Sequence, residues 1–148
     1  MKAPQELKGC YSVKEGTRII CDDAFFKCSS LTSIVISNSV VSIGDNAFKG
    51  CNSLSNVVIP NSVTTIEAGA FWDCSSLTSI VIPNSVVSIG DSAFEDCRFL
   101  LIIDIPDSVT SIGNSAFSGC NNLSYKLKQE LISCFGYKLF LAPYELPF

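Results

Sequence analysis

The sequence contains no histidine, which excludes histidine-based catalytic triads, histidine metal ligands and histidine acid–base catalysis. Charge is also scarce, because only 16% of the 148 residues are charged, 10 of them basic and 14 acidic. The net charge of −4 has the wrong sign for a protein that must neutralise nucleic-acid phosphates. Apolar runs such as LLII at 100–103 are far shorter than the roughly 20 residues that a membrane-spanning helix needs.

Apolar residues, in contrast, are abundant, at 47% of the chain. A chain of this length and composition can bury a core, so we expect a folded protein with a single domain over residues 1–148. Residues 1–20 show no signal-peptide pattern, so the sequence alone leaves the localisation unknown.

The dominant feature of the sequence is a 23-residue repeat. Several kinds of residue recur at this spacing and keep the same register through the chain, which is the signature of a repeat architecture. The clearest rows are cysteine at Cys28, Cys51, Cys74, Cys97 and Cys120, phenylalanine at Phe25, Phe48, Phe71, Phe94 and Phe117, and leucine at Leu31, Leu54, Leu77, Leu100 and Leu123.

Within a unit, apolar residues alternate at strand period over about residues 33–36, so we expect one strand in each unit. A second β-branched run at 40–43 predicts a short second strand. Asp45, and likewise Asp91 and Asn114, stand where the N-cap of a single helical turn carrying the Ala-Phe pair inward would lie. Each unit is therefore predicted to form one turn of a solenoid, stable only when stacked on its neighbours.

The ends of the array differ from its middle. Residues 8–30 match the unit only in their later half and are predicted to be a degenerate first repeat, followed by four full repeats over 31–122. Residues 123–148 are predicted to form a helical cap and tail. The helix is expected to begin after Ser124 and to stop at Gly136. Its apolar face is predicted to contain Leu127, Leu131, Cys134 and Phe135.

The segment DSVTSIGNSAFSGC at 107–120, together with its equivalents in the other units, resembles the BspA-like class of leucine-rich repeats. This resemblance implies a right-handed solenoid with parallel strands on its concave face and a helix closing one end. It also implies a non-catalytic protein that binds host or bacterial proteins and is located at the cell surface or secreted.

The eight cysteines raise the question of disulfides or zinc. Five lie on one row of the repeat, where we expect buried, inert thiols. Cys10, Cys21 and Cys134 lie off this row and are predicted to be the more reactive ones. No C-x-x-C pair is present, so no zinc site is predicted. Rungs about 4.8 Å apart would also allow occasional disulfides, which leaves the redox state open.

Motifs for catalysis are missing from the sequence: it has no G-x-S-x-G, no P-loop and no G-x-G-x-x-G. Ser39, Ser62, Ser85 and Ser108 recur with the repeat, so a structural role in the turns explains them better than catalysis. Asp22, Asp45 and Asp91 would stack as an acidic ladder, but N-capping explains them better than cation binding. We therefore predict no enzyme activity, no catalytic residue, no metal and no cofactor.

What remains is the outward side of the strand row, which a solenoid presents as one continuous surface. The predicted function is binding of a protein partner through this surface, with no nucleic acid and no membrane span. A competing explanation is that valine is present only because β-branched residues favour strands. The alternative function is a structural or weakly self-associating scaffold, in which the valines of this surface or the tail at 141–148 dock on a second copy. The surface has Val35, Val58, Val81 and Asp104 at its centre, Ser33, Asn56, Ser79 and Ile102 on one side, and Ser37, Pro60, Pro83 and Pro106 on the other.

Overall fold

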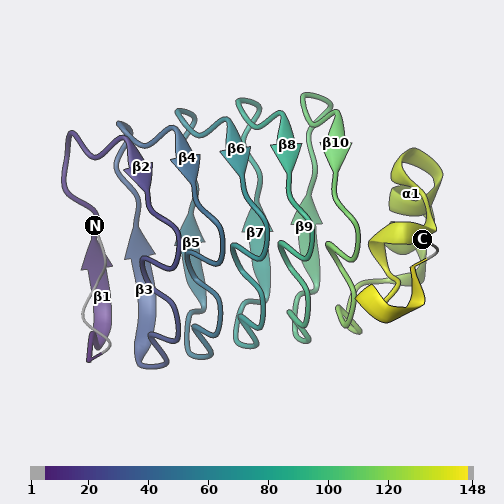
Figure 1. Ribbon diagram of the computed structural model, residues 1–148, viewed down its shortest axis with the longest axis horizontal. Helices are drawn as coiled ribbons and strands as arrows, with labels where there is room; N and C mark the ends of the chain where they lie inside the picture. The colour runs from purple at the N-terminus through teal and green to yellow at the C-terminus, as the bar shows by residue number, and fades with distance from the viewer. Residues whose placement is uncertain (1–5, 147–148) are drawn as a thin grey trace.

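The computed structural model describes residues 6–146 and shows a stack of coils closed at one end by a helix (Figure 1). Each coil contributes one strand to the first side of the stack and a two-residue strand to another side. The first and the last of the described residues lie at opposite ends of the stack (Figure 1). The predicted repeat solenoid is confirmed.

The strands of the first side run parallel, and each coil of the repeat supplies one of them. Ser33 is in register with Asn56, and Val81 with Asp104. These strands are β1 (Gly9–Ser12), β3 (Leu31–Val35), β5 (Asn56–Val58), β7 (Ser79–Val81) and β9 (Ile102–Asp104). The hydrogen-bonded pairs are β1 with β3, β3 with β5, and β7 with β9, and β5 packs beside β7.

The predicted second strands form a five-stranded parallel sheet on another side of the stack. The chain crosses between the two sides in each coil, so consecutive strands of one sheet are never consecutive in sequence. The strands of this second sheet are β2 (Ile19–Ile20), β4 (Ser42–Ile43), β6 (Thr65–Ile66), β8 (Ser88–Ile89) and β10 (Ser111–Ile112).

The segment around each Ala-Phe pair differs from the expected helical turn, because it forms two successive tight turns. Asn46 and Gly50 take left-handed conformations, with φ of 53° and 75°. Alternate backbone N–H groups point to the next coil, as the Phe48 N–H does when it donates to the Ala70 carbonyl at 2.8 Å. A helix would direct these donors back along its own segment, so bonding between coils prevents a helical turn here.

The aspartates of these turns also bond between coils. Asp45 Oδ1 accepts from the Ala68 N–H at 3.1 Å, and Asp91 Oδ1 accepts from the Asn114 N–H at 2.7 Å. The N-cap prediction was therefore wrong about the donor. Each carboxylate accepts a hydrogen bond from a backbone N–H of the following coil and not from one in its own turn. Asp22 Oδ1 does the same for the Asp45 N–H at 2.9 Å.

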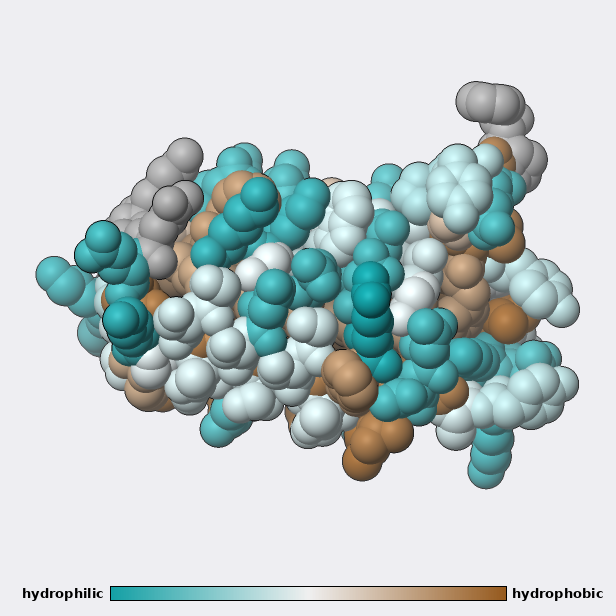
Figure 2. Space-filling view, turned by 90° about the horizontal axis from the view of Figure 1, so that it is seen from below, coloured by the Kyte–Doolittle hydropathy of each residue, from teal (hydrophilic) through white to brown (hydrophobic). Residues whose placement is uncertain are grey.

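The core lies between the sides of the stack and is organised by rows. Five phenylalanine rings stack face to face along it, with centroids 5.0 to 5.6 Å apart and planes within 8° of parallel. The cysteine and leucine rows are buried beside them. Most of the surface seen in Figure 2 is polar or neutral, consistent with this interior sequestering the apolar rows. The predicted alignment of equivalent side chains is confirmed.

The C-terminal helix α1 (Tyr125–Phe135) closes the stack as predicted. Ser124 Oγ accepts from the Leu127 N–H at 3.2 Å, and Gly136 ends the helix with a φ of 91°. Leu131 is buried on the last coil. Cys134 was assigned to the same face, but it is exposed, because this part of the helix leaves a gap beside the last coil.

The segment after α1 continues the ladder of the repeat, which the sequence pattern did not predict. It contains two short 3₁₀ helices, η1 (Tyr137–Leu139) and η2 (Pro143–Glu145). The Phe117 N–H donates to the Leu139 carbonyl at 2.8 Å, and the Phe140 ring lies 6.1 Å from the Phe117 ring. This segment thus accepts hydrogen bonds from backbone N–H groups of the last coil, which would otherwise bond to a further coil. The last two residues of the predicted tail at 141–148 lie outside the described residues.

Candidate functional site

The exposed side of strands β3, β5, β7 and β9, here called the strand face, presents a stripe of valines. Val35, Val58 and Val81 are 52%, 66% and 67% exposed. The neighbouring residues Val57 and Ile80 are buried, because successive side chains of a strand point to opposite faces. The three valines are therefore held outward by the core residues beside them.

Polar side chains border this stripe on the side where the strands begin. Asn56 and Ser79 are exposed at the first positions of β5 and β7, and Ser33 occupies the equivalent position of β3. In β9 the same position holds Ile102, which is exposed, and the valine position holds Asp104. The structure thus places all eight predicted residues on one surface, whose binding role stays a prediction.

The predicted border on the other side is different. Pro60 and Pro83 are buried, although they were expected to flank the exposed stripe. The strands end at Val58 and Val81, so the chain already turns inward at each proline. Asn61 and Asn84, one residue further on, form this border instead. The recurrence of Pro-Asn at 60–61 and 83–84 was the sequence signal that could have identified them.

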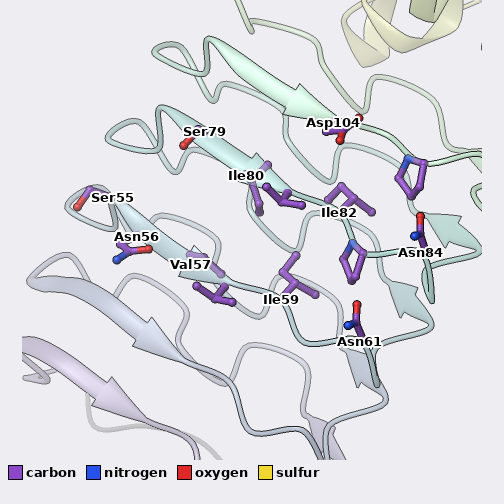
Figure 3. Close-up of a pocket in the computed structure, with 14 residues that line it drawn as sticks. Ser55, Asn56, Val57, Ile59, Asn61, Ser79, Ile80, Ile82, Asn84 and Asp104 are labelled. Carbon is purple, nitrogen blue, oxygen red and sulfur yellow. The ribbon is translucent and has the colours of Figure 1, made fainter.

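The strand face is hollowed over β5 and β7 by a depression of about 520 Å³. Figure 3 shows Asn61 and Asn84 at one end of it and Asn56 and Ser79 at the other. Asp104 supplies the only charge among its lining residues. An apolar floor with amides and hydroxyls at its ends can hold an extended segment of a partner by apolar contact and hydrogen bonds.

The thiols of the cysteine row are unsuited to chemistry. The Cys74 Sγ donates to the Phe48 carbonyl at 3.2 Å, and the equivalent bond recurs at Cys51, Cys97 and Cys120. Burial raises the pKa of the Cys74 and Cys97 thiols well above the ordinary value and that of Cys51 and Cys120 to about 12. Thiols that stay protonated are poor nucleophiles and poor metal ligands.

The off-row cysteines, Cys10, Cys21 and Cys134, are exposed. Within residues 6–146, no three or more Cys, Asp or Glu side chains are grouped so that they could hold a metal ion. In the same range, no helix is both long and apolar enough to cross a membrane.

The repeat pattern identifies the family. Residues 11–142 match the profile of the BspA type leucine-rich repeat region, in six copies. The chain belongs to this family. Leucine-rich repeat solenoids act generally as protein-interaction modules, so the BspA-type chain has the architecture of a binding scaffold.

Solved structures with the same fold come from bacteria. A leucine-rich cell surface protein from Faecalibacterium prausnitzii is 37% identical and has a TM-score of 0.81, covering 83% of this chain. The alignment covers only 33% of that protein, so this chain spans about a third of it. The T. pallidum leucine-rich repeat protein is 25% identical, with a TM-score of 0.69 and coverage of 90% of this chain and 86% of that one.

A third structure supports the fold alone. The pneumococcal vaccine antigen PcpA is 19% identical and has a TM-score of 0.73, with 94% of this chain and 42% of that chain covered. No protein with a curated description matches the chain.

Proposed function

We propose that this BspA-type chain binds a protein partner through the strand face and works as an adhesion-type module at the cell surface. The observation that carries the proposal is the exposed stripe of Val35, Val58 and Val81, held in line by strands in register. Contiguous exposed apolar surface with a polar border is typical of protein-interaction sites.

The chemistry of the strand face defines the partner it would fit. The apolar floor favours a partner segment with small apolar side chains, and the amides of Asn61 and Asn84 favour groups that can hydrogen-bond at its edge. Asp104 favours a basic group at the end of the segment nearest β9. The description of the F. prausnitzii relative as a cell surface protein supports the proposed location.

Replacing Val35, Val58 and Val81 together by lysine tests this proposal. All three side chains point outward, so the substitutions should leave the fold intact while placing desolvated charges in the interface. We expect the variant to lose capture of biotinylated surface proteins from intact bacterial and epithelial cells. Circular dichroism would check that the fold is retained.

The matched control places three lysines on another side of the stack, at Thr64, Val87 and Thr110. These residues are also exposed and also form one row of the repeat, so the added charge is the same. We expect this control to capture surface proteins as the unmodified chain does. Equal capture by both variants would show that the valine stripe is not the binding surface.

A further inference from the structure

The segment leading into β9 departs from the repeat at exposed positions only. Phe99, Leu101 and Ile102 stand where the equivalent positions of the preceding coil hold serine, threonine and serine. The intervening residues Leu100 and Ile103 are buried and keep the apolar character of their rows. Since neighbouring coils fold with polar side chains at these positions, the fold itself does not require apolar ones here.

These three side chains are left largely in water. Phe99 is 56% exposed, Leu101 53% and Ile102 65%. Figure 2 shows hydrophobic side chains standing out from a side of the molecule that is otherwise mostly polar or neutral. A cluster of exposed apolar side chains is unfavourable for a free monomer and marks an interaction surface.

Opposite charges flank this cluster along the chain. Arg98 precedes it and is one of two basic residues between Cys28 and Tyr125, and Asp104 follows it in place of a valine. Within residues 6–146, Arg98 forms one ion pair, in which its Nε lies 4.0 Å from Asp96 Oδ1 and both side chains are exposed. Such a contact is weak and leaves the guanidinium available for a better partner. The β9 patch is defined here as Arg98, Phe99, Leu101, Ile102 and Asp104.

The order of these residues is self-complementary. Leu101 is equally distant in sequence from Arg98 and Asp104, so two antiparallel copies of the segment place each arginine opposite the other copy's aspartate. A two-fold axis near Leu101 would form both charge pairs and bury both apolar centres at once. A parallel arrangement would instead place like charges opposite each other.

We propose that the β9 patch is a self-association site, at which two copies of this chain pair antiparallel about a two-fold axis. Charge complementarity within the patch is the reason for choosing a second copy as the occupant. The β9 patch shares Ile102 and Asp104 with the strand face, and Arg98, Phe99 and Leu101 are the residues that belong to the patch alone. Self-association through the patch does not depend on a partner bound at Val35, Val58 and Val81.

Two charge variants test the pairing by sedimentation equilibrium of the full chain. Arg98→Glu places two carboxylates opposite each other in both charge pairs, and Asp104→Lys places two cations there. We expect each variant alone to dimerise at least about tenfold more weakly than the unmodified chain. Concentrations up to about 1 mM are appropriate, because a patch of this size gives a weak dimer.

Mixing the two variants is the decisive measurement. One copy then carries two acidic groups and the other two basic groups, so both charge pairs become attractive in a mixed dimer. We expect an equimolar mixture to recover the association constant of the unmodified chain to within about threefold. No recovery on mixing would overturn the antiparallel pairing.

A third variant tests the apolar part of the β9 patch without disturbing the fold. Phe99→Ser, Leu101→Thr and Ile102→Ser together give this segment the residues of the preceding coil, so circular dichroism should be unchanged. We expect this variant to be monomeric. A monomeric unmodified chain at about 1 mM would overturn the proposal outright. Surface-protein capture by Arg98→Glu, which leaves the valine stripe intact, would report on the proposed function separately.

Discussion

At the residue scale, the cysteine row shows why one residue type recurs at the same position of successive coils. Four thiols of the cysteine row each donate to a phenylalanine carbonyl of the preceding coil, while their side chains pack as small apolar groups; they are those of Cys51, Cys74, Cys97 and Cys120. A serine could make the same bond but would place a more polar group in the core, and an alanine could not make it. Cysteine meets both requirements at once, which explains its recurrence without any redox or metal role.

The raised thiol pKa values predict how stability depends on pH. Cys51 has a pKa of about 12 in the folded chain, against 9.0 ordinarily, because of burial and then of repulsion from Cys28. The unfolded thiol therefore loses its proton first as the pH rises. The resulting stabilisation is complete below pH 9.0 and is lost towards pH 12.

The Cys51→Ala variant would isolate this effect. Each such thiol contributes a slope of up to about 1.4 kcal/mol per pH unit to the free energy of unfolding. We expect urea unfolding of the variant between about pH 8 and pH 10 to show a slope shallower by up to this amount. The two chains share every other titratable residue, so identical slopes would mean that burial does not raise the pKa of the Cys51 thiol.

At the scale of elements, the turns depend on the close approach of successive coils. A Cβ added at Gly90 would lie 2.5 Å from the Ala68 nitrogen and 2.7 Å from the Glu67 carbonyl carbon. Glu67 itself occupies the equivalent position in the preceding coil, where the backbone accommodates a side chain. Glycine is therefore required at this position of the repeat in the coil of Gly90 but not in the coil of Glu67.

Substitution by alanine should destabilise the chain at Gly90 but have little effect at Glu67. We expect Gly90→Ala to lower the free energy of unfolding by about 1–3 kcal/mol, because the backbone of the neighbouring coil must shift. Glu67→Ala is the matched control and should change it by less than about 0.5 kcal/mol. Urea unfolding followed by circular dichroism would measure both, and equal effects would contradict this account of the turn.

The segment after α1 provides a second prediction at this scale. Leu139 is fully buried, and its carbonyl accepts the Phe117 N–H at the end of the ladder. We expect Leu139→Ala to cost about 2–5 kcal/mol of stability through the cavity it leaves. Tyr144→Ala, at a side chain that is 88% exposed, should cost less than about 0.5 kcal/mol in the same thermal or urea unfolding experiment.

The sequence pattern predicts some elements better than others, for physical reasons. The strands and α1 follow from periodicity and from a local cap at Ser124, which are visible in one stretch of chain. The hydrogen-bond donors to Asp45 and Asp91 do not follow from such local patterns, because these N–H groups belong to the next coil. The burial of Pro60 was missed because it depends on where the chain turns after β5.

At the scale of the whole molecule, each coil contacts mainly its neighbours, and all rows share one register. The eight residues predicted from the sequence for the strand face lie together because a 23-residue step returns each strand to the same side. The β9 patch was not predicted, since single-unit patterning emphasises what the coils share. The patch becomes visible when each coil is compared with the preceding one, because exposed polar residues are then seen to be replaced by apolar ones.

This modularity predicts that a whole coil can be removed. Deletion of residues 54–76 joins Ser53 to Leu77 and preserves every row, so we expect a folded chain with cooperative urea unfolding and a smaller m-value. Deletion of 54–75, one residue fewer, makes the coil across the junction 24 residues long and displaces the rows on its two sides by one position relative to each other. We expect that chain to unfold at a lower urea concentration than the 54–76 deletion, and equal midpoints would contradict the shared register.

The hydrogen bonds between coils also have a mechanical consequence. They point along the stacking direction, and β1 and α1 lie at opposite ends of the stack (Figure 1). A force that pulls the ends apart therefore loads one inter-coil interface at a time, as in peeling. Each released coil would add roughly 80 Å of contour length, so a tethered chain would yield in equal steps instead of failing at once.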